Sequence, residues 1–86
     1  MEKIYKKIKN LNELKAIIAD LKRQNKTIAH CHGVFDLIHP GHIRHLAAAK
    51  KEADVLVVTV TADQFVKKGP GRPIFNENLR AETLAS

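Results

Sequence analysis

Residues 27–60 read TIAHCHGVFDLIHPGHIRHLAAAKKEADVLVVTV, and this stretch decides the fold. It opens with a short run that ends at Gly33, which predicts a strand over residues 27–32. It closes with a near-continuous β-branched run over residues 55–60, typical of a strand buried on both faces of a parallel sheet. The residues between the two runs predict a helix. Strand, helix and strand in this order form a βαβ unit with parallel strands.

The helix between the strands is expected to begin near Pro40. Proline suits the first turn of a helix because the N–H that it lacks would be unpaired there in any case. We expect the helix to run to about Glu52, with four apolar side chains turned inward: Ile43, Leu46, Ala47 and Ala53. Residues 33–40 form the preceding loop, at the carboxyl end of a strand, where open α/β sheets bind ligands.

Helices are also predicted on both sides of the βαβ unit. Apolar residues recur at three- and four-residue steps before it and predict one helix face: Leu11, Leu14, Ile17, Ile18 and Leu21. Asn10 and Glu13 can form a capping box at the start of that helix, which should end near residues 24–25. Residues 67–73 are rich in Gly and Pro and predict a loop, and a last helix should start near Asn76. The expected fold class is α/β, the N-terminal half of a doubly wound parallel sheet.

The length of 86 residues is enough for one domain and not for two, so we expect one structural unit. Within it, residues 1–26 form a basic amphipathic helical segment, and residues 27–86 an incomplete core. The net charge is +6, and residues 1–26 hold eight Lys or Arg against three Asp or Glu. We interpret the excess as a solvated helix face. Nucleic acid is not expected as a partner, because only Tyr5 interleaves with the basic residues.

Composition and the cysteine count exclude two classes of protein, those that span a membrane and those held together by internal disulfides. No apolar run approaches 18 residues, so we expect no membrane span, and no signal peptide is expected at the charged start of the chain. The one cysteine, Cys31, excludes an internal disulfide framework and fits a reducing, cytoplasmic compartment. A buried strand position is the favoured interpretation of its thiol, ahead of a nucleophile.

The chemistry of the chain is concentrated in the loop and helix start after the first strand. His39 and His42 stand three residues apart across the first helical turn, with Gly41 between them. A helix N-terminus with unpaired N–H groups binds phosphates. Gly33 lets the backbone approach a ligand closely, and imidazoles can stabilise the charge that develops on a phosphoryl group during transfer.

This stretch, GVFDLIHPGH over residues 33–42, resembles the signature of the cytidylyltransferase-like nucleotidyltransferases, which carry an H-x-G-H motif. The likeness covers about residues 26–86. Beyond the motif it includes residues 60–63 at the end of the second strand, the basic loop with Lys67, Lys68, Arg72 and Pro73, and Arg80 in the following helix. Two branches are most similar, the glycerol-3-phosphate cytidylyltransferases and the adenylyltransferases that make ADP-heptose. The leading helix and the phrase KGPGRP over residues 68–73 favour the heptose-type branch.

The resemblance implies a Rossmann-like fold and transfer of AMP or CMP from ATP or CTP to a sugar or polyol phosphate, with release of pyrophosphate. It implies His39 and His42 as catalytic residues and Arg80 as a contact to the second substrate. It implies that the nucleotide contacts Gly33, Val34, Phe35, Asp36, Gly41, Lys67, Lys68 and Arg72. Mg²⁺ would accompany the nucleotide, and no metal site of the protein's own is expected.

Several alternatives remain open from the sequence. The family's second signature, of the form I-S-T-T-K, does not occur here, so we expect an N-terminal part of the enzyme whose own turnover is undecided. A non-catalytic nucleotide-binding or dimerisation fragment and a piece of a class I aminoacyl-tRNA synthetase are the competing functions. A zinc site is a minor alternative for His30, His32, His39, His42 and His45. A bare sheet edge would favour a homodimer.

Overall fold

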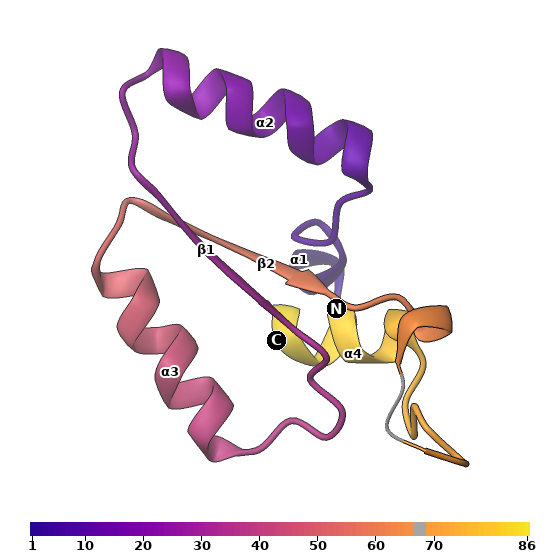
Figure 1. Ribbon diagram of the computed structural model, residues 1–86. Helices are drawn as coiled ribbons and strands as arrows, with labels where there is room; N and C mark the ends of the chain where they lie inside the picture. Colours follow the sequence, from indigo (N-terminus) through magenta and orange to yellow (C-terminus); the bar gives the residue numbers. More distant parts are fainter. Residues whose placement is uncertain (67–68) are drawn as a thin grey trace.

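The computed structural model describes residues 1–66 and 69–86 and confirms the predicted βαβ unit. In chain order its elements are α1 (Glu2–Tyr5), α2 (Leu11–Arg23), β1 (Ile28–Gly33), α3 (Pro40–Lys51), β2 (Val55–Val60), the 3₁₀ helix η1 (Asp63–Phe65) and α4 (Glu77–Ala85). β1 and β2 form a two-stranded parallel sheet, and α3 connects them (Figure 1). Both strands therefore end at the same edge, where the loops after them meet.

The register of the sheet is set at the starts of the strands. The backbone N–H of Thr27 donates to Asp54 Oδ2 at 2.8 Å, and the Thr27 hydroxyl donates to the same oxygen at 3.1 Å. In return, the Asp54 N–H donates to Thr27 Oγ1 at 3.0 Å. The hydrogen bonds from Thr27 hold the pKa of Asp54 below its ordinary value. This exchange fixes the pairing of Ile28 with Val55 and carries it through to Gly33.

The predicted N-terminal helix is present as α2, with the predicted caps. Asn10 Oδ1 accepts from the N–H of Glu13 at 2.8 Å, and Glu13 Oε1 accepts from the N–H of Asn10 at 3.0 Å. Asn25 ends the helix in the left-handed conformation at φ 58°, and the N–H of Lys26 donates back to the carbonyl of Leu21. No helix in residues 1–66 and 69–86 has both the length and the apolar character needed to cross a membrane.

A short helix, α1, precedes α2 and was not predicted from the sequence. It packs against α4, near the other end of the chain (Figure 1). The Tyr5 hydroxyl donates to Glu82 Oε1 at 3.1 Å, and Lys7 Nζ donates to the carbonyl of Ala85 at 3.1 Å. The hydrogen bond to Glu82, and after it the negative charge of Glu82, raise the pKa of Tyr5. These hydrogen bonds join the N-terminal segment to the last helix.

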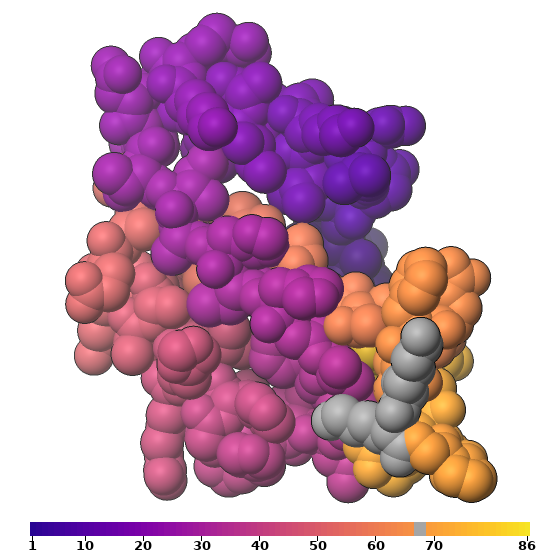
Figure 2. All heavy atoms as spheres, in the orientation of Figure 1, coloured from indigo at the N-terminus to yellow at the C-terminus, as the bar shows by residue number. Residues whose placement is uncertain are grey.

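The packing departs from two expectations. Every residue of β2 is half-buried rather than buried on both faces, and Ile43 is 49% exposed although it was predicted to face inward. Ala47 is also exposed. Of the other two residues predicted to face inward, Leu46 is buried and Ala53 is half-buried. A two-stranded sheet offers little surface for helices to cover, and Figure 2 shows the residues of α2 at one end of the molecule.

The most deeply buried groups among the described residues are charged rather than apolar. Arg80 is 1% exposed and Asp36 is 3% exposed, whereas Leu46 is 8% exposed. Asp36 follows β1, and the Arg80 guanidinium reaches from α4 to the residues that follow both strands. The carboxyl end of the sheet therefore holds the most deeply buried charges of the described residues.

Candidate functional site

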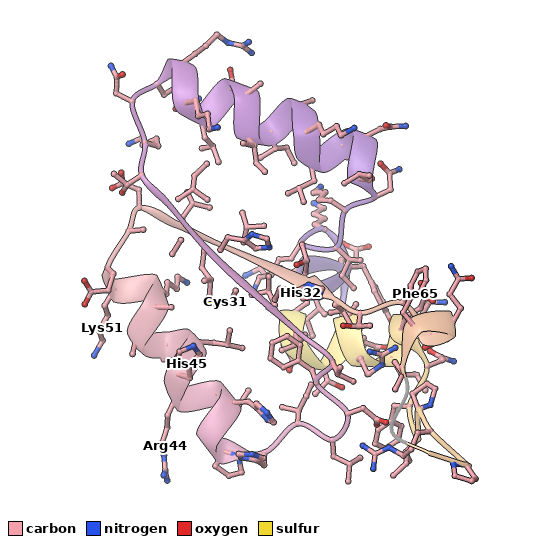
Figure 3. The ribbon with its side chains drawn as sticks, viewed as in Figure 1. Cys31, His32, Arg44, His45, Lys51 and Phe65 are labelled. Atoms are coloured by element: carbon pink, nitrogen blue, oxygen red, sulfur yellow. The ribbon has the colours of Figure 1, made fainter. Side chains whose placement is uncertain are left out.

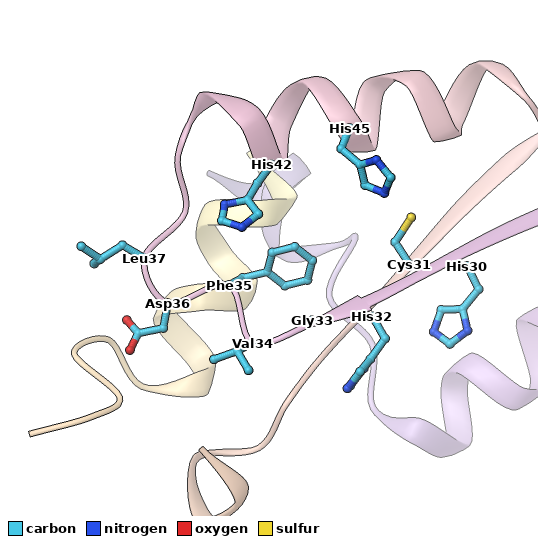
Figure 4. Close-up of a pocket in the computed structure, with 10 residues that line it drawn as sticks. All are labelled: His30, Cys31, His32, Gly33, Val34, Phe35, Asp36, Leu37, His42 and His45. Carbon is cyan, nitrogen blue, oxygen red and sulfur yellow. The ribbon is translucent and has the colours of Figure 1, made fainter. Parts of the chain in front are cut away.

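A pocket of about 430 Å³ lies at the carboxyl end of β1, beside the first turns of α3 (Figure 4). Its lining consists of His30, Cys31, His32, Gly33, Val34, Phe35, Asp36, Leu37, His42 and His45. The pocket therefore brings together five of the residues predicted for the site: Gly33, Val34, Phe35, Asp36 and His42. His39 and Gly41 lie beside it in the first turn of α3.

The two histidines of the H-x-G-H motif cap helix α3. His39 is the N-cap, and its Nδ1 accepts from the N–H of Gly41 at 3.0 Å. His42 Nδ1 accepts from the N–H of His39 at 3.1 Å, and the ring centroids are 4.0 Å apart. A ring nitrogen that accepts a hydrogen bond carries no proton, so in both neutral imidazoles the proton is on Nε2. Each ring thus has the tautomer that can donate to a phosphate oxygen.

The unpaired N–H groups that we expected at the start of α3 are already occupied, so this part of the prediction is wrong. Pro40 has no N–H, and the N–H of Gly41 donates to the His39 ring. The N–H of His42 donates to the carbonyl of His39 at 2.9 Å. The physical reason is the histidine cap, which satisfies the first turn from within. The first backbone N–H groups of α3 are therefore not open to a phosphate without a change in this cap.

Gly41 is required by the His39 ring and not by its backbone angles. A Cβ atom at this position would lie 2.6 Å from His39 Cε1 and 2.9 Å from Nδ1. Both distances are well inside van der Waals contact, so any larger residue displaces the ring. The glycine of the motif thus keeps the capping histidine in place.

The loop after β1 presents backbone groups to the same pocket. The N–H groups of Val34 and Phe35 make no hydrogen bond to another described residue. Phe35 has a positive φ of 54°, and its ring meets the His42 ring edge-on at 5.6 Å. These N–H groups lie beside the capped helix start. The prediction that the loop contacts a nucleotide stays a prediction, and this geometry is compatible with it.

Asp36 holds the loop over residues 72–75. Its Oδ2 accepts from Arg72 Nε at 3.0 Å and from the N–H of Ile74 at 2.8 Å, and its Oδ1 accepts from the N–H of Phe75 at 3.3 Å. Arg72 also donates to the Asp36 carbonyl. Burial alone would raise the pKa of Asp36, but the two backbone donors and the Arg72 charge together bring it below the ordinary value.

This network bears on where a magnesium ion could be held. The Asp36 side chain has no exposed surface, and both of its oxygens accept hydrogen bonds. It therefore does not fit as a ligand of Mg²⁺. Asp36 instead orients the loop over residues 72–75.

The predicted basic residues have different surroundings. Arg72 is ion-paired with Asp36 and its side chain is 26% exposed. Arg80, predicted to contact the second substrate, is buried and donates only to groups of the protein. Lys67 and Lys68 lie outside the described residues. The structure thus brings Arg72 to the edge of the site and places Arg80 beneath it.

The remaining histidines do not converge as the zinc alternative requires. His30 Nε2 and His32 Nδ1 both lie near Thr59 Oγ1, at 2.8 and 2.7 Å. Figure 4 shows these two rings on one side of β1, and His42, His45 and Cys31 on the other. Within the described residues no three His, Cys, Asp or Glu side chains are grouped as metal ligands.

The half-buried Cys31 points from β1 toward α3, and His45 points from α3 toward β1 (Figure 4). Figure 3 shows His45 directed toward the sheet, and Arg44 and Lys51 directed away from it. Helix α3 therefore has one face toward the pocket and one basic face in solvent. Cys31 lies on the strand as expected, but it is half-buried rather than buried, and it lines the pocket.

Sequence reasoning missed the part played by Thr61 and Asp63. The N–H of Thr61 donates to the Gly33 carbonyl at 3.0 Å, which extends the ladder one step beyond β2. Asp63 Oδ1 accepts from Arg80 Nη2 at 2.6 Å. The sequence contained one signal for this contact: Asp63 stands just after the second predicted strand, and Arg80 stands in the next predicted helix. Opposite charges in these two places can meet at the carboxyl edge of the sheet.

A sequence model described as cytidylyltransferase-like matches residues 30–86, two thirds of the chain, and this range contains the whole pocket. The chain belongs to the cytidylyltransferase-like family. The resemblance found in residues 33–42 is thereby confirmed. The order helix, strand, helix, strand, helix is that of the N-terminal half of a Rossmann-like nucleotidyltransferase domain.

Proteins named bifunctional protein HldE are similar over almost the whole chain. The protein from Desulfatibacillum aliphaticivorans is 45% identical over 82 residues, which is 93% of this chain and 17% of that protein. The one from Geobacter metallireducens is 44% identical with the same coverage, and the one from Nitratiruptor is 43% identical over 92% of this chain and 18% of its own. The chain thus spans about a sixth of these relatives. No solved structure matches it.

Proposed function

We propose that this chain forms the nucleotide-phosphate-binding part of a cytoplasmic nucleotidyltransferase. The enzyme transfers AMP or CMP from ATP or CTP, bound with Mg²⁺, to a sugar or polyol phosphate and releases pyrophosphate. The observation that carries the proposal is the pair of capping histidines beside the loop after β1: both Nδ1 atoms accept backbone hydrogen bonds, which leaves the ring proton on Nε2. Family membership supports the same reaction type.

The reaction needs positioning and charge stabilisation more than proton transfer. An oxygen of the acceptor phosphate forms a bond to the α-phosphorus, while the bond from that phosphorus to the bridging oxygen of the β-phosphate breaks. The acceptor is already an anion, so no general base is required. His39 and His42 would donate from Nε2 to oxygens of the reacting phosphates, on which negative charge builds up. The Val34 and Phe35 N–H groups would hold the nucleotide in line.

The heptose-type branch is the favoured one within this proposal. The sequence resemblance pointed to it, and the relatives reported above are all named HldE. It implies ATP as the nucleotide and a heptose phosphate as the acceptor. A homodimer belongs to the same proposal, because each strand of the two-stranded sheet keeps one edge unpaired within the described residues.

Pyrophosphate release by the natural full-length protein that contains these residues tests the proposal. The assay supplies Mg²⁺, either ATP or CTP, and a series of sugar and polyol phosphates. We expect release with one nucleotide and one class of acceptor. His42→Ala should lower kcat by about 100- to 1000-fold, the usual effect of removing one preorganised donor.

Arg44→Ala is the control, since Arg44 lies on the same helix and points away from the sheet (Figure 3). It should leave the rate unchanged. Absence of pyrophosphate release with every acceptor, or equal rates for His42→Ala and the native protein, would contradict the proposed function.

A further inference from the structure

The loop after β1 contains a residue in a conformation that side chains rarely adopt. Phe35 has φ 54°, in the left-handed region, although it is neither glycine nor asparagine. Such a residue persists only where its surroundings hold it on both sides. The groups that hold Phe35 therefore decide the shape of the loop that faces the pocket.

On its N-terminal side, Phe35 is held through the carbonyl of Val34. This oxygen accepts from Arg80 Nη1 at 2.7 Å, and the same nitrogen donates to the carbonyl of Thr61 at 2.8 Å. Arg80 Nη2 donates to Asp63 at 2.6 Å. One guanidinium thus joins the residues that follow β1 to the residues that follow β2.

On its C-terminal side, Phe35 is followed by the buried Asp36, which the loop over residues 72–75 holds. Arg80 reaches this loop too, because its Nε donates to the carbonyl of Phe75 at 2.9 Å. The Phe35 ring packs edge-on against His42. A change in the backbone at Phe35 would therefore move a group that contacts a motif histidine.

We propose that Arg80 is a positioning residue of the nucleotide site: it fixes the Val34 carbonyl and so holds Phe35 in the left-handed conformation that orients the loop and the His42 ring. The inference rests on the proposed function and replaces the expectation that Arg80 contacts the second substrate. Arg80 is 1% exposed and makes four hydrogen bonds to the protein. It offers a substrate no accessible surface.

Two variants of the natural full-length protein test this role. Arg80→Met removes all four hydrogen bonds, and Arg80→Lys keeps the charge but has one nitrogen that cannot reach all the acceptors at once. Leu84→Ala is the matched control, one turn further along α4 at a half-buried position. The measurements are the dissociation constant of the Mg-nucleotide, the KM for the acceptor, and amide hydrogen exchange at Thr61 and Ile74.

A positioning role predicts that both Arg80 variants weaken nucleotide binding by about 10- to 100-fold, as expected for a displaced site. Exchange at Thr61 and Ile74 should quicken, and Leu84→Ala should change neither quantity. A raised KM for the acceptor with an unchanged nucleotide dissociation constant would overturn the inference, because it would make Arg80 a substrate ligand. So would nucleotide binding and exchange that match the control.

Asp63→Asn keeps the inference testable if both Arg80 variants fail to fold. It removes the charge from the Asp63 side chain that accepts from Arg80, and it leaves the three hydrogen bonds from Arg80 to backbone carbonyls in place. It should weaken nucleotide binding in the same direction, and unchanged binding would overturn the inference. A native protein that binds neither nucleotide would contradict the proposed function instead, while the exchange rates would still report whether Arg80 holds the loop.

Discussion

Replacing Gly41 by alanine tests the histidine cap, because the new Cβ would lie 2.6 Å from His39 Cε1. A carbon–carbon contact is comfortable only at about 3.5–4.0 Å, so the ring must move by roughly 1 Å. That movement breaks the bond from the Gly41 N–H to His39 Nδ1. Loss of an N-cap costs about 1 kcal/mol.

An opposing term comes from helix propensity. Alanine is preferred over glycine within a helix by up to about 1 kcal/mol. The two terms nearly cancel, so we expect the free energy of unfolding of Gly41→Ala to stay within about 1 kcal/mol of the native value. Nucleotide binding should nevertheless weaken by about tenfold or more, because the His39 ring has left its position.

A double-mutant cycle separates the two terms. With His39→Ala as background there is no ring to displace, so Gly41→Ala should stabilise the protein by about 0.5–1 kcal/mol. The coupling between the two sites should then be about 1 kcal/mol, measured by urea unfolding of the chain followed by circular dichroism. An identical effect of Gly41→Ala in both backgrounds would refute the steric argument.

Three further predictions concern stability and titration. The folded state lowers the pKa of Asp54, so the contribution of this carboxylate to stability is complete above about pH 4 and is lost as the pH falls through the folded-state pKa. The melting temperature of Asp54→Asn should therefore fall less on acidification than that of the native chain. Equal slopes would contradict this. Leu46→Ala should cost about 2 kcal/mol in urea unfolding, near the lower end for a core leucine, because much around it is half-exposed; no measurable loss would show that Leu46 is not core. Ultraviolet titration should give Tyr5 a pKa above its ordinary value, and Glu82→Gln should bring it back; the same midpoint in both would exclude the contact.

Features coded by neighbouring residues could be predicted from the sequence. The capping box of Asn10 and Glu13, the proline start of α3 and the β-branched run of β2 each depend on a few adjacent positions. The H-x-G-H motif likewise pointed to the family, because its spacing is local. The capping role of the histidine rings could have been read from their positions at the helix start, although histidine is an uncommon cap.

Features that depend on distant residues could not be predicted in this way. Asp36 and Arg72 are 36 positions apart, and Arg80 reaches back 46 positions to Val34. Nothing local distinguishes an arginine that binds a substrate from one that binds three carbonyls of its own chain. The exposure of Ile43 likewise depends on what covers α3, which its own helical period does not encode.

Calorimetric titration with Mg-ATP and with Mg-CTP tests the central claim most directly, since the claim is that residues 33–42 bind the phosphates of a nucleotide. The account predicts saturable binding of one nucleotide, lost in His42→Ala and kept in Arg44→Ala. Binding that survives in His42→Ala, or that both variants lose alike, would contradict it. So would the absence of binding to either nucleotide by the folded full-length protein.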